Sequence, residues 1–390
     1  MFKNIFKSRV ALLYILSISM IFSFSAWMSL LNNFVVEIAK FNGSQIGFLQ
    51  SIREIPGFLS FGVIFVLFFV SQQRLAYISM IALGAGVALT GLFPSTIGLY
   101  VTTLIMSLGF HYLATINQSL SLQWLDKKTS PVTLGKITAA NSFIKLLVFV
   151  LIFFMMKFYS IEFKSVYLIF GGVTVVLGIL SWALFEHFKD DVPQENKLKL
   201  KKEYWLFYVL TFFAGARRQI FIVFASFLLV QKFGVSVEHM VILLFVNSIL
   251  NIYLAPKIGK YIVRFGERLA LRVEYIGLIV IFSSYAFVND VNIAYFLYIC
   301  DHLLFSMAIA LKTYFQKISN PKDLSSASAV SFTINHIAAV FLPAILGIIW
   351  LWSNSLVFII GTTIAICSLA LSFLIPQNPH QGNETTLVKI

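Results

Sequence analysis

Two adjacent arginines, Arg217 and Arg218, lie halfway along an apolar stretch that runs from roughly Tyr204 to Val230. A stretch of this length and composition can cross the hydrocarbon core of a bilayer as a helix. A charged side chain at that depth costs about 2.5 to 3.5 kcal/mol on insertion scales, and it faces a protein interior or an aqueous cavity that holds a partner. Arginine keeps its charge and binds carboxylate or phosphate through a planar fork. The pair therefore predicts an anchor for an anionic ligand, with an interhelical ion pair as the alternative.

Further ionisable side chains lie inside other apolar stretches. They are Arg53, Glu54, His111, Lys145, Asp301, His302, Lys312 and His336. With the arginine pair, this inventory holds five permanent cations and two carboxylates, Glu54 and Asp301. If both carboxylates are ionised and paired, three positive charges need another counter-ion. An anionic ligand would supply it, so the surplus predicts a small organic anion as substrate.

Glu54 and Asp301 are also the two acids of this inventory that could carry a coupling proton. A carboxylate beside a cation stays ionised, whereas one in an apolar site takes up a proton, and transport can switch it between the two states. The alternative is that each acid permanently neutralises a neighbouring cation. For the histidines, packing or a hydrogen bond to ligand is the favoured interpretation. No apolar stretch carries two histidines four residues apart and no thiolate accompanies them, so we predict neither a metal site nor a cofactor.

The composition is that of an integral membrane protein. Of the 390 residues 59% are hydrophobic and only 12% are charged, and the mean hydropathy is +0.89, whereas globular soluble domains carry about 25% charged residues. The two cysteines, Cys300 and Cys367, both lie in apolar stretches and predict no disulfide framework. The basic N-terminus is followed by an apolar run without a small-residue cleavage site, which predicts an uncleaved first span.

Apolar stretches recur about twelve times along the chain. We place them at 10–33, 45–70, 75–93, 97–123, 132–157, 164–185, 204–230, 238–262, 269–288, 292–315, 324–350 and 354–375. A polar insert splits them six and six. The expected domains are therefore an N-terminal half (1–186), a cytoplasmic linker (187–203), a C-terminal half (204–376) and a flexible polar tail (377–390).

Lysine and arginine placement predicts the orientation. With both termini in the cytoplasm, twenty basic residues fall on the inside and four on the outside, in agreement with the positive-inside rule. This topology explains most of the net charge of +13, so nucleic acid is not an expected partner. We expect a multi-pass protein of a plasma or inner membrane, in contact with lipid and monomeric.

The two halves show an internal repeat. The segment Leu12–Ser17 (LLYILS) lies over Leu206–Thr211 (LFYVLT) at an offset of 194 residues. At this offset Ser23 and Phe24 stand opposite Arg217 and Arg218, so the arginine pair is an asymmetric addition to a symmetric frame. Parallel repeats joined by a cytoplasmic linker characterise one large class of secondary transporter, with the substrate site at the repeat interface.

Twelve spans, the six-plus-six repeat and the central polar loop resemble the major facilitator superfamily over essentially the whole chain. The basic loop motif of that family is similar to Gly259-K-Y-I-V-Arg264-F-Gly266-E-Arg268, with Val263 where an acid is usual. The resemblance implies an all-α membrane protein with two six-helix halves related by a pseudo-twofold axis. It implies that Gly259, Arg264, Gly266 and Arg268 form a conformational loop.

The resemblance also implies that spans 1, 4, 7 and 10 line a central cavity, with 2, 5, 8 and 11 beside them. Neighbouring helical residues point about 100° apart, so only one member of Arg53/Glu54 or Arg217/Arg218 can point straight into such a cavity. Asn117 and Gln219 add neutral polar groups, although for each residue on its own an interhelical hydrogen bond is the favoured interpretation. The candidate substrate-binding residues are Arg217, Arg218, Arg53, His111, Lys145, His336, Asn117 and Gln219.

We therefore expect a secondary active transporter that moves a small organic anion by alternating access, with proton coupling or anion exchange. The alternative within the same fold is a drug or amphipathic-metabolite exporter whose cations are mostly paired internally. A transporter-like receptor is the alternative from another class. An enzyme is not expected, because the sequence shows no nucleophile–base pair and no glycine loop of the kind that cradles phosphate.

Overall fold

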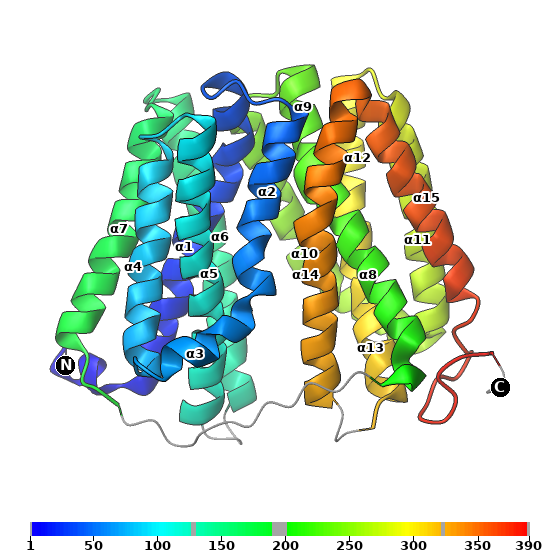
Figure 1. The fold of residues 1–390 in the computed structure, drawn as a ribbon, viewed down its shortest axis with the longest axis horizontal. Coiled ribbons are helices and arrows are strands. Elements are labelled where there is room, and N and C mark those ends of the chain that lie inside the picture. Colours follow the sequence, from blue (N-terminus) through cyan, green and yellow to red (C-terminus); the bar gives the residue numbers. More distant parts are fainter. Residues whose placement is uncertain (1, 126–129, 189–200, 321–323, 388–390) are drawn as a thin grey trace. The chain divides into compact units, whose positions relative to one another are not determined.

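The computed structural model describes residues 2–125, 130–188, 201–320 and 324–387, and these residues form helices without a named β-strand. In the first part of the chain the α-helices are α1 (Arg9–Glu37), α2 (Gly43–Phe58), α3 (Val63–Leu67), α4 (Gln72–Thr90), α5 (Thr96–Trp124), α6 (Ser130–Lys157) and α7 (Phe163–Leu184). In the second part they are α8 (Trp205–Gln219), α9 (Ser226–Phe233), α10 (Val237–Phe265), α11 (Glu267–Phe287), α12 (Val291–Phe305), α13 (Ile309–Ile318), α14 (Leu324–Trp352) and α15 (Asn354–Ser372) (Figure 1).

Within the described residues, eleven helical stretches are long and apolar enough to cross a membrane. They correspond to eleven of the twelve predicted spans, and the protein is a multi-pass integral membrane protein. The stretch predicted at 45–70 is instead broken, because α2 ends at Phe58 and is followed by a 3₁₀ turn (Ser60–Gly62) and the short α3. Pro56 lies in the last turn of α2, where it removes a backbone donor and favours an interruption.

The chain forms two compact units that are not simply its two linear halves. Unit 1 contains Met1–Phe41, Ile52–Gln194 and Ser236–Phe245. Unit 2 contains Asn42–Ser51, Glu195–Val235 and Val246–Ile390. The short segments 42–51 and 236–245 are thus each assigned to the unit of the other half. Most of the predicted linker, 189–200, lies outside the described residues.

In unit 1 the helices approach closely at glycines. A Cβ atom on Gly109 of α5 would lie 2.2 Å from the backbone nitrogen of Leu83 in α4, and one on Gly171 of α7 would lie 2.3 Å from that of Ala88. Small residues let membrane helices come into backbone contact, where van der Waals packing holds them together. Helix α4 is therefore clamped between α5 and α7.

In unit 2 the initial part of α2 packs against α14. A Cβ on Gly47 would lie 2.2 Å from the carbonyl oxygen of Pro343, and the backbone N–H of Ala344 donates to Ser51 Oγ at 3.0 Å. Helices α8, α11 and α13 surround a second core that includes Tyr204, Tyr275 and Tyr314. Helix α8 packs against α14 and α15, and α15 packs against α11, which sets the surroundings of the arginine pair.

The predicted span 204–230 is helical throughout but changes its winding. Helix α8 ends at Gln219, a π-helical segment covers Ile220–Ala225, and α9 follows directly. π-Helical turns are rare and often occur at functional sites. Here the wide turn begins two residues after Arg218, which marks the arginine pair as a special position in the helix.

The polar tail folds back onto unit 2 over its described part. The hydroxyl of Tyr314 in α13 donates to the carbonyl oxygen of Glu384 at 2.5 Å, and the N–H of Thr386 donates to that of Leu374 at 2.8 Å. The tail expected to begin at residue 377 thus forms a hydrogen-bonded loop up to Leu387, while 388–390 lie outside the described residues.

Candidate functional site

Arg217 forms the centre of a buried polar cluster in unit 2. Its side chain is 3% exposed, and its Nη2 lies 3.6 Å from Oε1 of Glu274 in α11. It also donates to the hydroxyl of Ser368 in α15, and its guanidinium lies 4.5 Å from the ring centroid of Tyr275. Because α15 packs against both α8 and α11, these last two helices come close, and two helices, α11 and α15, supply partners for one arginine.

A second carboxylate, that of Asp301 in α12, belongs to the same cluster. Asp301 is 1% exposed and lies within Coulombic range of both Arg217 and Glu274. Its Oδ2 and the Oε2 of Glu274 have no hydrogen-bond partner among the described residues. One fixed cation therefore serves two buried carboxylates.

The other predicted residues of unit 2 differ in exposure and in hydrogen bonding. Arg218 is half-buried, whereas Gln219 is fully buried and neither of its amide atoms has a hydrogen-bond partner within the described chain. His336 in α14 is 5% exposed, and its Nδ1 lies 2.9 Å from the carbonyl oxygen of Phe332. Lys312 in α13 is exposed. The cluster thus gathers Arg217 and Asp301 from the predicted set.

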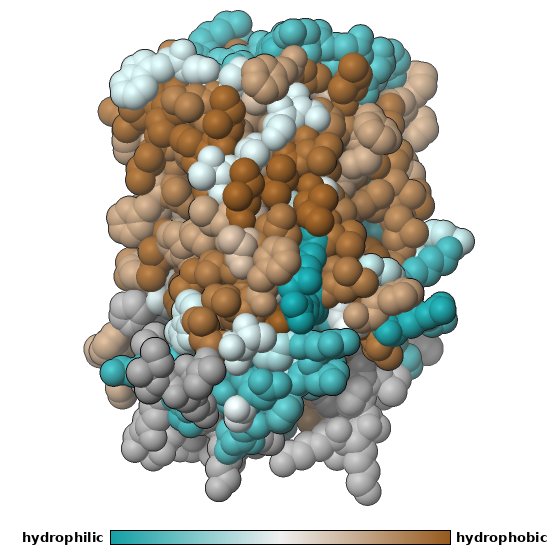
Figure 2. All heavy atoms as spheres, turned by 90° about the vertical axis from the view of Figure 1, so that its right-hand side faces the viewer, coloured by the Kyte–Doolittle hydropathy of each residue, from teal (hydrophilic) through white to brown (hydrophobic). Residues whose placement is uncertain are grey.

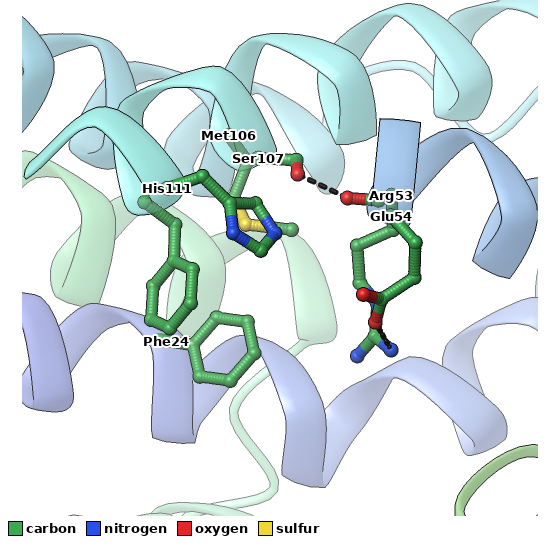
Figure 3. A pocket seen from close by; sticks show the side chains of 7 residues that line it. Phe24, Arg53, Glu54, Met106, Ser107 and His111 are labelled. Carbon is green, nitrogen blue, oxygen red and sulfur yellow. Dashed lines mark hydrogen bonds and ion pairs between the residues drawn. The ribbon is translucent and has the colours of Figure 1, made fainter. Parts of the chain in front are cut away.

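A second polar centre lies in unit 1, around a small cavity of about 40 Å³. Its lining comes from α1, α2 and α5, and consists of Phe24, Arg53, Glu54, Met106, Ser107, Phe110 and His111 (Figure 3). Phe24 and Phe110 stack with ring centroids 4.2 Å apart. The cavity therefore combines aromatic faces with a small number of polar groups.

Arg53 and Glu54, both 6% exposed, form an ion pair with each other in this centre. Arg53 also donates from Nη1 to the sulfur of Met28 at 3.2 Å, and its carbonyl oxygen accepts from the Ser107 hydroxyl, as Figure 3 shows. The Nε of Arg53 has no hydrogen-bond partner in the described residues. The two side chains belong to adjacent residues of α2 and neutralise each other's charge.

Lys145 and Asn117 have simpler surroundings in unit 1. Lys145 in α6 is half-buried, and its Nζ lies 5.7 Å from the ring centroid of Phe149. No ion pair links it to a carboxylate of the described chain. Asn117 Nδ2 donates to Ser17 Oγ at 2.7 Å, which is the interhelical hydrogen bond that the sequence left open for it.

The basic loop motif spans the junction of α10 and α11. Gly266 has φ = +85°, a backbone conformation that favours glycine, and it separates the two helices. Arg264 is exposed, Arg268 is half-buried, and a Cβ on Gly259 would meet open space. The motif therefore contains one glycine with a conformational requirement, at Gly266.

The count of two carboxylates at membrane depth was wrong, because it omitted Glu274. This residue lies in the predicted span 269–288, is 2% exposed and pairs with Arg217. Glu267, seven residues earlier on the same face, is 3% exposed and pairs with Lys317 at 2.8 Å. That spacing of two acids was a signal in the sequence, since residues seven apart share a helix face. Arg272 lies in the same predicted span, so counting both residues leaves the surplus of positive charge at three.

Comparison with known proteins gives a family and a fold. A family model described as Major Facilitator Superfamily matches residues 11–315. A crystal structure of the nucleoside transporter NupG, as a D323A mutant, is similar with a TM-score of 0.75 and 15% identity, covering 93% of this chain and 99% of that one.

A bacterial homolog of the human lysosomal transporter Spinster, in an inward-facing and unoccupied conformation, has a TM-score of 0.69 and 12% identity, covering 94% of this chain and 96% of that one. A search of curated proteins found no match. At these identities the two structures show the fold alone.

Proposed function

The chain belongs to the major facilitator superfamily, and we propose that it couples the movement of a small polar organic solute to protons. As a member of this family, the protein is a multi-pass secondary transporter and not an enzyme. The observation that carries the coupling is the buried cluster of Arg217, Glu274 and Asp301. The basic-residue distribution supports an orientation with both termini in the cytoplasm.

The cluster supports proton coupling through its charge balance. If both carboxylates were ionised beside one arginine, a net negative charge would remain in a medium of low dielectric constant, which is costly. A single proton held by either Glu274 or Asp301 removes that charge. When the site opens to water the proton can leave, and Arg217 can then interact with both carboxylates. Uptake and loss of one proton with a change in side-chain pairing is the elementary step that coupling needs.

The unit 1 cavity supports a solute with a flat ring. The stacked faces of Phe24 and Phe110 lie beside the Ser107 hydroxyl, the His111 ring and the Arg53–Glu54 pair. Ligand sites typically combine such apolar walls with a few polar groups. Because Phe24 and Phe110 stack on each other and the cavity has only about 40 Å³, a ring-bearing solute would have to separate the two rings and widen the cavity in order to stack against them. A nucleoside, the solute named for the similar NupG structure, has this chemistry. We therefore propose a neutral, ring-bearing polar solute as the first candidate.

An organic anion is the second candidate, and Lys145 is the observation that favours it. This cation lies half-buried in α6 and forms no ion pair within the described residues. Arg53 and Arg217, by contrast, have protein counter-ions. If the protein is an exporter, its buried cations should also be paired within the protein. The uptake experiment therefore tests the direction of transport as well as the substrate.

Uptake by proteoliposomes tests the proposal. Purified protein is reconstituted, an inward or outward proton gradient is imposed, and accumulation of tritiated uridine or adenosine is compared with that of labelled benzoate. We expect nucleoside transport that follows the proton gradient in the wild type. Asp301→Asn and Glu274→Gln should each abolish the dependence on the gradient, because each removes a carboxylate that can hold the coupled proton.

The matched control is Glu203→Gln, which removes an exposed acid of the same chemistry. It should leave gradient-driven transport unchanged. Gradient-driven transport that survives in both Asp301→Asn and Glu274→Gln would contradict the coupling proposal. Transport of benzoate but not of nucleosides, lost in Lys145→Gln, would replace the first substrate candidate by the second.

A further inference from the structure

Arg268 and Arg272 lie one helical turn apart near the start of α11, and both have unpartnered donors. Within the described residues, the Nε of Arg268 and the Nε and Nη2 of Arg272 are buried atoms without a hydrogen-bond partner. The Arg272 guanidinium lies 4.1 Å from the ring centroid of Phe373, at the end of α15. Leaving charged donors unsatisfied in a buried position costs free energy, so this pair is arranged for a partner that the described residues do not supply.

The acidic residues of α11 are not that partner. Glu267 pairs with Lys317 at 2.8 Å, and Glu274 pairs with Arg217. Both acids lie on the buried face of the helix. The two arginines stand about 100° to 140° around the helix from Glu267, so they point away from that face. Two like charges one turn apart repel each other, and an anion between them would remove this repulsion.

The neighbouring face of α11 is apolar and open to the surroundings. Leu269, Val273, Ile276 and Val280 are all exposed, as expected for a helix face in contact with lipid. The arginines lie at the boundary between this face and the buried one. Figure 2 shows, on the right-hand face, hydrophilic side chains that reach from the lower end of the molecule into the hydrophobic band. A ligand reaching the arginines would therefore arrive along the lipid-exposed side.

We propose that Arg268 and Arg272 bind the phosphate of an anionic phospholipid headgroup, with Phe373 as an apolar wall. Arginine binds phosphate bidentately, and long basic side chains near helix ends reach the headgroup region. Arg264 is exposed on the adjoining end of α10 and adds a positive field. The basic-residue distribution predicts that this end is cytoplasmic, the side where anionic lipids attract such clusters.

Lipid retention by the full-length protein tests the site. The purified protein is equilibrated in mixed micelles with phosphatidylglycerol or phosphatidylcholine. Native mass spectrometry counts the retained lipids, and thermal unfolding gives the Tm. We expect the wild type to retain phosphatidylglycerol selectively and to gain Tm from it. Replacing both residues in R268Q/R272Q should lower retention by about fivefold per arginine, as expected for basic groups at an anionic surface.

The matched control is K257Q/K260Q, which removes two exposed charges from the same end and should retain phosphatidylglycerol at close to the wild-type level. Equal retention by R268Q/R272Q and the wild type would overturn the proposal, and so would an equal loss in the control. A Tm gain from inorganic phosphate without lipid that matches the gain from phosphatidylglycerol would assign the site to free phosphate and overturn the lipid assignment.

If R268Q/R272Q does not fold, R268K/R272K keeps the charge but not the bidentate geometry, and undiminished retention by that variant would overturn the proposal.

Discussion

The two buried charged centres solve the same problem in different ways. In unit 1, Arg53 and Glu54 are neighbours on one helix and neutralise each other. In unit 2, Arg217 on α8 takes its counter-ion Glu274 from α11, with Asp301 of α12 close by. The first centre has one acid for one permanent cation, with the His111 ring within 4.8 Å of the Glu54 carboxylate, whereas the second has two acids for one permanent cation.

This difference separates a closed pair from an open cluster. A closed pair has no charge to exchange, so its removal as a whole leaves nothing unbalanced. An open cluster has one carboxylate more than its cation can neutralise, so its charge state depends on a proton. Under the proposed function, the coupled proton is held in unit 2, and unit 1 supplies ring faces and hydrogen bonds.

The largest effect should come from removing the shared cation. Arg217→Gln leaves Glu274 and Asp301 buried without their arginine, and breaking a buried ion pair on one side costs about 3–5 kcal/mol. We expect a strongly lowered Tm in detergent, together with loss of gradient-driven transport. The adjacent Arg218→Gln is the matched control, because Arg218 is half-buried and its loss leaves the Arg217–Glu274 pair in place. Equal Tm losses in the two variants would show that the cluster is not held by Arg217.

Much of the fold was predictable from the sequence, because apolar length is a strong signal in membrane proteins. Eleven of the predicted spans correspond to helices of the described chain that can cross a membrane. The break after Phe58 does not follow from apolar length or periodicity, and its signal in the sequence is Pro56 in the turn just before it. The exchange of segments 42–51 and 236–245 between the units was not predictable either, because it depends on packing between distant parts of the chain.

The candidate sites were predictable only in part. Local geometry pairs residues that are close in the sequence, but it does not pair residues that are far apart. Arg53 and Glu54 are adjacent, so their pairing follows from local geometry, although the sequence did not exclude other roles. Glu274 was missed because it follows the basic residues Arg268 and Arg272, which were assigned to a loop, while its partner Arg217 lies 57 residues earlier. No local pattern joins α8 to α11. Only the packing of these helices makes the pair.

A smaller loss of stability should follow from disturbing the helix packing that positions the unit 1 centre. In unit 1 the helix that carries Phe110 and His111 touches α4 through Gly109, whose Cβ would lie 2.2 Å from the backbone nitrogen of Leu83. Gly109→Ala should therefore force α5 from α4 and cost about 1–3 kcal/mol, the usual range for overpacking. Gly172→Ala is the control, since a Cβ there meets nothing within 4 Å, and it should be neutral or stabilising. A Tm for Gly109→Ala at or above that of Gly172→Ala would refute this account of unit 1.

The smallest effect should come from removing the closed pair as a whole, and it separates the two centres most directly. R53Q/E54Q replaces both charges by amides of similar size, and replacing a buried ion pair together is often neutral, so we expect a change under about 1 kcal/mol. The corresponding R217Q/E274Q variant should remain clearly destabilised, because Asp301, 1% exposed, keeps its carboxylate without the arginine. Adding Asp301→Asn to that variant should then restore part of the lost Tm. If instead R53Q/E54Q and R217Q/E274Q unfold at the same temperature, Asp301 does not depend on Arg217, and unit 2 would contain a closed pair like that of unit 1.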